Sequence, residues 1–475
     1  MRGVMKVKTG VDGFDEIVPG FPRGGIIIVS GSPGTGKTSF AASFVYNGAV
    51  KYGEPGVYAS LIEDEGRFYE YMSGLGYDFE NLRKEGLFRY LALPTLLESG
   101  VASSITLTLD VAESIGAKRL VIDSYTALSQ MFKSQAEART FLHTLISKVV
   151  KQLECTTILV REEPRARKAE YGFEEFIADG VIMLNAETID GRQFREINML
   201  KMRGAEMRYP TACFTLHQGF KVFAPREPLK RGRPAVFKPL EDPPGGITTG
   251  IPDLDIELGG YPKGSSILIE IDPKLTLNEY ALLVIPPLAN YIAKNRPYIA
   301  IPTGGVTWKE ITRLLKDYGL SDEQIGKFSK IVLETKTELR TDEPPYVVRM
   351  NVRDPEEAYQ QFLNLVATVM KEHGNPPIKT IGMDRLVYAL GEKALSIIYR
   401  GIDLTREVGC VMMWLVKPTH PWLVERLAPL ADIYLKVTRR HGCIMLYGIK
   451  PRTPLYAVQP DPTGETPTPK ITPIT

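Results

Sequence analysis

The residues best suited to chemistry lie in one short run, Gly31–Thr38, which reads GSPGTGKT. The run matches G-x-x-x-x-G-K-[ST] at every fixed position, and such loops surround phosphate oxygens with backbone N–H groups. An apolar, β-branched segment precedes the loop and a segment of helical composition follows it, so we expect a strand–loop–helix unit. A chance glycine-rich turn is the alternative, and this context disfavours it. The residues predicted to contact the nucleotide are Ser32, Pro33, Gly34, Thr35, Gly36, Lys37, Thr38 and Ser39.

The end of the loop and a later acidic residue predict a site for ATP with Mg²⁺. We expect Lys37 to reach the β- and γ-phosphates and the Thr38 hydroxyl to bind Mg²⁺. An apolar run ends in Asp123, and a carboxylate at the end of a core parallel strand lies beside the loop in this fold class. Asp123 is therefore the second predicted Mg²⁺ ligand. The alternative is that Asp123 caps the next helix.

Glu63 is the predicted residue that orients or deprotonates the attacking water. It follows the strand-like run at residues 57–62, next along the chain from the loop and its helix. Hydrolysis of ATP requires such a group, and a carboxylate at the tip of a neighbouring strand can supply it. Because residues 63–65 are all acidic, a solvated turn is the alternative interpretation.

Lys201 and Arg203 form a second candidate for catalysis. Alternate residues of a strand share one face, so these two side chains point the same way. Two adjacent cations suit a phosphate group that gains charge during transfer, as an arginine finger does. A solvated basic face is the alternative.

The bulk composition limits the class of protein. The chain has 475 residues, 44% of them hydrophobic and 24% charged, which predicts two or three folded domains. The net charge of +2 does not indicate nucleic acid or an acidic membrane as a partner. The four cysteines form no CxxC pair and predict buried thiols in a reducing compartment. Without an apolar run of about 18 residues, we expect no membrane partner and a cytoplasmic location.

An internal repeat relates the two halves of the chain. Residues 9–28 and 249–268 share Thr, Gly, Asp, Gly, Pro and Gly at a constant offset of 240. At the same offset the phosphate loop becomes IDPKLTLN, with Leu277 in the position of Lys37. Residues 300–305, the counterpart of the Glu63 region, contain no carboxylate. We therefore interpret the second copy as a pseudo-ATPase domain.

The repeat sets the predicted domain boundaries. We expect an active domain at 1–224, a basic Pro-rich linker at 225–244, a degenerate domain at 245–458 and a disordered Pro/Thr-rich tail at 459–475. Strand-like and helix-like segments, including a helix at 136–153, alternate within each copy. This alternation predicts an α/β fold with a mainly parallel twisted sheet flanked by helices in each domain.

The first copy resembles RecA-superfamily ATPases of the KaiC and archaeal RadA-like group. The resemblance rests on the TG-x-x-x-x-D entry, GSPGTGKTS, GEPGVY, LVIDSYTAL, EYGFEEFIADGVIML and LKMRG, and covers most of residues 1–224. The second copy matches through its entry sequence, ADIYL and Met383-Asp384 as a relic of the Mg²⁺-binding acid. The resemblance implies two tandem RecA-like P-loop domains.

The resemblance also implies a homohexamer that binds ATP at subunit interfaces, with Lys201 and Arg203 acting on a neighbour's nucleotide. Two positions depart from the family pattern. Ile62 replaces the first of two paired glutamates, and Met207 stands where a histidine is common. The KaiC kinase reaction belongs to its second domain, which here lacks the phosphate loop. We therefore predict neither autophosphorylation nor a circadian role.

Three functions follow from these observations. The first is a slow regulatory ATPase that acts on an unknown protein partner, with the second domain as scaffold. The second is a DNA recombination or repair ATPase that binds DNA through Arg165, Arg167, Lys168 and the AT-hook-like run at 231–234. The near-neutral charge disfavours DNA. The third is a nucleotide sensor that binds ATP without turnover.

Overall fold

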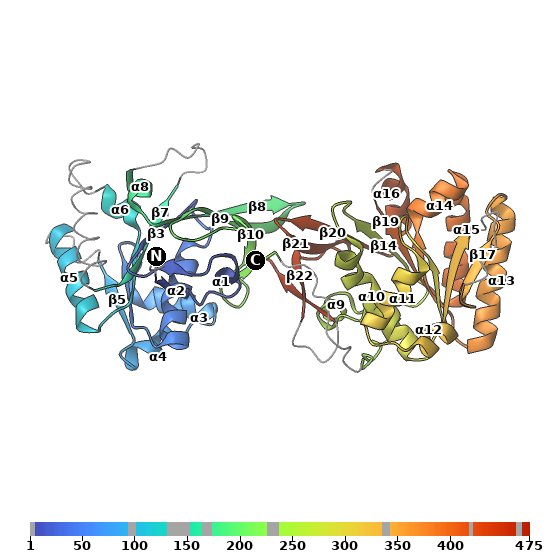
Figure 1. The fold of residues 1–475 in the computed structure, drawn as a ribbon, viewed down its shortest axis with the longest axis horizontal. Helices are drawn as coiled ribbons and strands as arrows, with labels where there is room; N and C mark the ends of the chain where they lie inside the picture. The colour runs from blue at the N-terminus through green and yellow to red at the C-terminus, as the bar shows by residue number, and fades with distance from the viewer. Residues whose placement is uncertain are drawn as a thin grey trace. The chain divides into compact units, whose positions relative to one another are not determined.

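A computed structural model describes most of the chain as two compact units (Figure 1). One unit comprises Met1–Pro225 with His441–Cys443 and Pro473–Thr475, and the other comprises Arg226–Arg440 and Ile444–Thr472. The described residues are 5–93, 101–130, 153–163, 173–225, 237–334, 343–417, 421–461 and 468–475. The predicted helix at 136–153, the basic residues at 165–168 and the AT-hook-like run lie outside these ranges, except for the last residue of that helix.

The first unit is built on a nine-stranded sheet in the order β11-β10-β9-β8-β3-β7-β6-β4-β5. The strands from β8 to β5 in this order are parallel, whereas β9, β10 and β11 pair antiparallel. The elements are β1 (Lys6–Val7), α1 (Phe14–Ile17), β2 (Phe21–Pro22), β3 (Ile26–Gly31), α2 (Lys37–Tyr52), β4 (Gly56–Ser60), α3 (Glu65–Gly74), α4 (Phe79–Lys84), β5 (Phe88–Ala92), α5 (Val101–Ser114), β6 (Arg119–Asp123), α6 (Tyr125–Ser129), β7 (Thr156–Glu162), α8 (Phe173–Ile177), β8 (Gly180–Ile189), β9 (Arg192–Met202), β10 (Thr211–Thr215) and β11 (Lys221–Phe223).

The central strand β3 carries apolar side chains on both faces because helices cover both sides of the sheet. Ile27 and Val29 pack into one core with the aromatic residues of α1 and α2. Ile26 and Ile28 pack into the opposite core with α5 and α6. A strand buried on both faces reads as a continuous apolar run, which is why the sequence alone predicted β3.

The second unit contains a ten-stranded sheet in the order β17-β16-β15-β18-β19-β14-β20-β21-β22-β23. The strands from β17 to β20 in this order are parallel. Its elements are β12 (Gly246–Ile247), α9 (Pro252–Leu258), β13 (Tyr261–Pro262), β14 (Ser266–Ile271), α10 (Leu277–Ala293), β15 (Tyr298–Ile301), α11 (Trp308–Asp317), α12 (Asp322–Phe328), β16 (Ser329–Glu334), β17 (Val347–Met350), α13 (Pro355–His373), β18 (Ile378–Gly382), α14 (Met383–Leu390), α15 (Lys393–Val408), β19 (Val411–Val416), α16 (Pro421–Leu427), η3 (Ala428–Leu430), β20 (Ile433–Arg440), β21 (Cys443–Lys450), β22 (Tyr456–Pro460) and β23 (Pro469–Pro473).

The two units repeat one design, and the α/β class with two mainly parallel sheets is confirmed. β14 occupies the residues of β3 shifted by 240, and α10 begins 240 residues after α2. All four cysteines are free and buried, as expected. Among the helices of the described ranges, none is long and apolar enough to cross a membrane.

Two expectations for the second copy were wrong. The first is the tail from residue 459, which was predicted to be disordered. Its first two residues belong to β22, and Pro469–Pro473 form β23, in which Ile471 is buried. The Pro/Thr-rich composition hid this strand because a sheet edge tolerates proline. The second is Met383-Asp384, which was expected to be a relic of the acid at the end of a strand. The last residue of β18 is Gly382, at the position that Asp123 occupies in β6, and Asp384 lies in the first turn of α14.

Candidate nucleotide-binding site

The phosphate loop joins the carboxyl end of β3 to the start of α2. Gly36, the residue before the helix, has φ of +97°, a backbone conformation that a side chain would strain. Within the described residues no side chain caps the N-terminus of α2. Its first N–H groups therefore remain available to an anion, and the helix dipole adds to the attraction.

The side chain of Lys37 packs back against the phosphate loop. Its side chain is buried, and Nζ donates a hydrogen bond of 2.9 Å to the carbonyl of Ser32. Burial lowers the pKa of Lys37, while the carboxylates of Glu162 and Asp123 oppose that shift. Because the ammonium is desolvated and held by one carbonyl, a phosphate oxygen would be a strong competing partner for it.

Thr38 and Asp123 meet across 85 positions of sequence. The Thr38 hydroxyl donates a hydrogen bond of 2.8 Å to Oδ2 of Asp123, the last residue of β6. Burial raises the pKa of Asp123, and hydrogen bonds from Tyr58 and Thr38 oppose the rise. A hydroxyl and a carboxylate fit Mg²⁺, which is bound through one or two carboxylates, waters and substrate phosphates. The described residues contain no group of three or more His, Cys, Asp or Glu that could hold a metal by itself.

The three acids after β4 have different surroundings. Asp64 accepts a hydrogen bond from the Arg67 N–H and caps α3, and Glu65 accepts one from the Tyr69 hydroxyl. The carboxylate of Glu63 has no hydrogen-bond partner among the described residues. Burial raises the pKa of Glu63, and the charges of Asp123 and Asp64 add to this effect. Glu63 is thus the acid of the run that is free to act on a ligand.

Three residues near the loop were missed by sequence reasoning. Glu162 lies opposite Gly31 in the β3–β7 register, and an apolar strand ending in an acid could have pointed to it. Tyr58 on β4 donates a hydrogen bond of 2.6 Å to Asp123 Oδ2, but a tyrosine in a strand gives no such signal. Arg195 on β9 donates to the carbonyl of Gly34 at 3.0 Å, so it supports the loop from the side.

Lys201 and Arg203 lie together but away from the phosphate loop of their own chain. Residue 202 pairs with Gly180, which itself pairs with Ile27, whereas the loop follows Gly31 at the opposite end of β3. Lys201 Nζ donates to the carbonyls of Glu175 and Phe176 at 2.9 and 3.1 Å. Arg203 donates to the Phe176 carbonyl at 3.0 Å and pairs with Asp179 at 3.3 Å.

The corresponding loop of the second unit differs in charge and capping. Its Asp272 accepts a hydrogen bond of 2.8 Å from the Thr438 hydroxyl. The start of α10 carries a capping box in which Glu279 accepts from the backbone N–H and the hydroxyl of Thr276 at 2.6 and 2.8 Å. Arg439 pairs with Glu279 at 3.1 Å. The start of α10 is therefore capped by the carboxylate of Glu279, whereas no described side chain caps the start of α2.

The first unit is similar in sequence to known proteins. A family model described as "ATPase: KaiC" matches residues 7–227. The circadian clock oscillator protein KaiC of Parathermosynechococcus lividus is 34% identical over 234 residues, which cover 47% of this chain and 43% of that protein. The UPF0273 protein PF1931 of Pyrococcus furiosus is 32% identical over 252 residues, which cover 48% of this chain and 98% of that protein.

A solved structure is also similar to the chain. The KaiC-like protein PH0186 of Pyrococcus horikoshii OT3 is 35% identical, with 46% of this chain and 100% of that chain covered and a TM-score of 0.42. The match to the cyanobacterial clock protein above spans less than half of that protein's length.

Proposed function

The chain belongs to the KaiC family of ATPases, and from this we propose that its first unit binds ATP with Mg²⁺ and hydrolyses it slowly to regulate a protein partner. One observation carries the proposal. The uncapped start of α2, the buried Lys37 and the Thr38–Asp123 pair converge at the carboxyl edge of one sheet. A helix terminus, a cation and hard oxygen ligands are the parts that a nucleoside triphosphate requires.

Each residue has a distinct proposed role. Lys37, now bonded to the Ser32 carbonyl, would contact the β- and γ-phosphates, and Thr38 with Asp123 would hold Mg²⁺. The metal ion, when bound, neutralises charge on the phosphates. Glu63 orients the attacking water and accepts its proton, and the raised pKa makes its carboxylate a stronger base than an ordinary glutamate.

The two basic residues of β9 are proposed to act on the nucleotide of an adjacent subunit. They sit at the end of the strands opposite to their own phosphate loop, so an action within one chain would need a large rearrangement. Phe176, whose carbonyl binds both side chains, is itself 70% exposed. A homohexameric ring, as the family resemblance implies, would place this edge against a neighbouring site.

The second unit is proposed to bind no nucleotide and to act as a scaffold. Asp272 would repel phosphate, and Glu279 already accepts hydrogen bonds at the start of α10. A phosphate at this position would have to displace a carboxylate that is paired with Arg439.

Steady-state phosphate release from ATP–Mg²⁺, measured with and without single-stranded DNA, tests the proposal. Lys37→Ala should abolish turnover. Lys274→Ala, in the exposed counterpart loop, is the matched control and should not change it. Slow turnover indifferent to DNA supports a regulatory ATPase. Strong stimulation by DNA would instead make the protein a recombination or repair ATPase, and nucleotide binding without turnover would make it a sensor.

A further inference from the structure

Two side-chain hydroxyls of the first unit hold the backbone on both sides of Glu63. Ser60, the last residue of β4, accepts hydrogen bonds from the N–H groups of Ile62 and Glu63 at 3.3 and 3.0 Å. Tyr90 of β5 donates a hydrogen bond of 2.7 Å to the Glu63 carbonyl. The peptide groups before and after the Cα of Glu63 are therefore both held, and its carboxylate moves only by rotation of the side chain.

These two anchoring hydroxyls, of Ser60 and Tyr90, are themselves held in place by the sheet. Ser60 is buried and is the register partner of Asp123 on β6. The Tyr90 ring is buried too, stacks parallel to the ring of Tyr58 and lies 4.9 Å from the ring of Phe68. Because close packing restricts both side chains, their hydroxyls keep one direction and pass that precision to the chain after β4.

The second unit builds the corresponding strands without these hydroxyls. The last residue of β18 stands at the Asp123 position, and from there the register of β15, β16 and β18 gives the counterparts of Ser60 and Tyr90. They are Pro302 and Ile331, which have no hydroxyl. The segment that follows β15 contains no carboxylate at the corresponding positions. The sheet thus forms without the two hydroxyls, which accompany the acid rather than the fold.

We propose that Ser60 and Tyr90 are positioning residues that hold the Glu63 carboxylate toward the attacking water. The inference rests on the proposed role of Glu63, which accepts the proton of the water as its oxygen bonds to the γ-phosphorus and the bond to ADP breaks. A catalytic group must lie within about 0.5 Å of its productive place, and a displacement of about 1 Å can cost about 100-fold in rate. Loss of either anchoring hydroxyl frees one of the two peptide groups beside Glu63.

The test measures phosphate release from ATP–Mg²⁺ by the full chain and, separately, the binding of a fluorescent ATP analogue. Tyr90→Phe and Ser60→Ala should each lower kcat at least about tenfold. Binding of the analogue should not change, because both hydroxyls act on the chain after β4 and not on the phosphate loop. Tyr69→Phe is the matched control, since this ring lies 6.4 Å from that of Tyr90 but its hydroxyl donates to Glu65. Its kcat should equal that of the unaltered chain.

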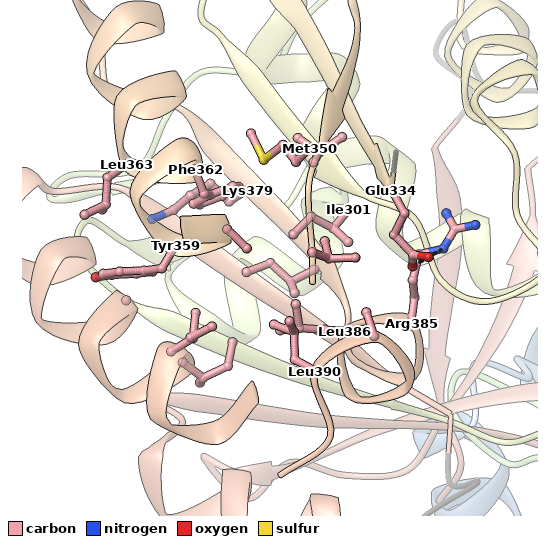
Figure 2. Close-up of a pocket in the computed structure, with 18 of the residues that line it drawn as sticks. Ile301, Glu334, Met350, Tyr359, Phe362, Leu363, Lys379, Arg385, Leu386 and Leu390 are labelled. Atoms are coloured by element: carbon pink, nitrogen blue, oxygen red, sulfur yellow. Dashed lines mark ion pairs between the residues drawn. The ribbon is translucent and has the colours of Figure 1, made fainter. Parts of the chain in front are cut away.

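A positioning role differs from a structural one in the Glu63→Gln background. If Tyr90 acts through the Glu63 carboxylate, Tyr90→Phe should have no further effect on the rate once that carboxylate is gone, as single turnovers with excess enzyme can measure. A substitution that only loosens the sheet would lower the rate by the same factor in both backgrounds. Tyr359→Phe, at an apolar pocket of the second unit (Figure 2), is a second control and should change neither rate.

The outcomes separate this inference from the proposed function. An unchanged kcat in Tyr90→Phe or in Ser60→Ala would overturn the assignment of that residue, and an equal loss in the Glu63→Gln background would overturn the inference as a whole. The proposed function survives either result if Lys37→Ala and Glu63→Gln still lose turnover. A normal rate in Glu63→Gln, or no turnover by the unaltered chain, would overturn both. If one of the two hydroxyl variants does not fold, the other decides.

Discussion

Tyr58 and Tyr90 form a natural pair for measuring how the first site holds Asp123. The two residues are register partners on β4 and β5, and their rings stack with centroids 6.0 Å apart. The Tyr58 hydroxyl donates to the Asp123 carboxylate at 2.6 Å, and the Tyr90 hydroxyl donates to the backbone carbonyl of Glu63 at 2.7 Å. Conversion of each to phenylalanine removes the hydrogen bonds of its hydroxyl, but only the bond from Tyr58 has a titratable acceptor.

The expected magnitudes differ accordingly. A hydrogen bond to a charged group contributes about 1.5–3 kcal/mol, and one to a neutral group about 1 kcal/mol. Because Asp123 keeps its bond from Thr38, we expect Tyr58→Phe to cost about 1.5 kcal/mol where the carboxylate is ionised. Loss of the same bond should raise the pKa of Asp123 further, since the Tyr58 bond is the largest factor that opposes burial.

The sign of the pH dependence follows from this. The Tyr58 bond favours the ionised carboxylate, so its contribution is full above the still higher pKa that Asp123 has in Tyr58→Phe and declines as pH falls from there through the folded-state pKa of the unaltered chain. The cost of Tyr58→Phe should therefore shrink in acid, whereas the cost of Tyr90→Phe should not change across the same range.

Hydrogen exchange of backbone amides in β4 and β6 of the full chain gives the opening free energy of this sheet without assuming two-state unfolding of both units. A double-mutant cycle with Asp123→Asn isolates the coupling, expected at about 1.5 kcal/mol. A coupling below about 0.5 kcal/mol, or equal and pH-independent costs for the two tyrosines, would refute the account of how Asp123 is held.

Four further outcomes are expected. Asp123→Asn should stabilise the nucleotide-free protein, because burial penalises only the charged form of Asp123. The gain over the unaltered chain should grow as pH rises from the ordinary aspartate pKa through the raised folded-state pKa, and melting curves at several pH values check this. Glu63→Gln should lower phosphate release at least about 100-fold while ATP binding persists, and the acidic limb of the unaltered enzyme's rate profile should lie above the usual glutamate pKa. An equal mixture of Lys37→Ala and Arg203→Ala chains, each inactive alone, should recover about a quarter of normal turnover if the arginine serves a neighbouring subunit in a ring, and none if it serves its own chain. Arg119→Leu should lower the opening free energy of β6, measured by hydrogen exchange, by about 3–5 kcal/mol. The guanidinium is fully buried and donates to a carboxylate and three backbone carbonyls.

The features predicted from sequence were those encoded locally or by strand direction. The phosphate loop is contiguous, so its pattern alone names the ligand class. The approach of Thr38 to Asp123 over 85 positions followed from the rule that parallel strands end at one edge of the sheet. Tyr58 escaped detection because a buried strand tyrosine is indistinguishable in sequence from an ordinary core residue, and its role depends on where one hydroxyl points.

The comparison of the two copies shows which parts of the repeated sequence hold the fold and which serve the ligand. Asp15 accepts hydrogen bonds of 2.9 Å from the backbone N–H groups of Thr9 and Gly10, and Asp255 accepts one of 2.7 Å from the N–H of Thr249. The shared entry motif is thus a turn-stabilising device that both sheets need.

The two copies differ in the loop between the first core strand and the helix that follows it. In the second copy, the exposed helix terminus that a phosphate would satisfy is satisfied by Glu279 of the same helix. The first N–H groups of an α-helix have no partner within the helix, so a side chain, water or a ligand accepts their hydrogen bonds. The second copy therefore combines a side-chain carboxylate at the helix terminus with a loop that lacks the glycine pattern. Glu279→Ala should destabilise the second unit without conferring nucleotide binding, because the loop still lacks both its glycines and its lysine.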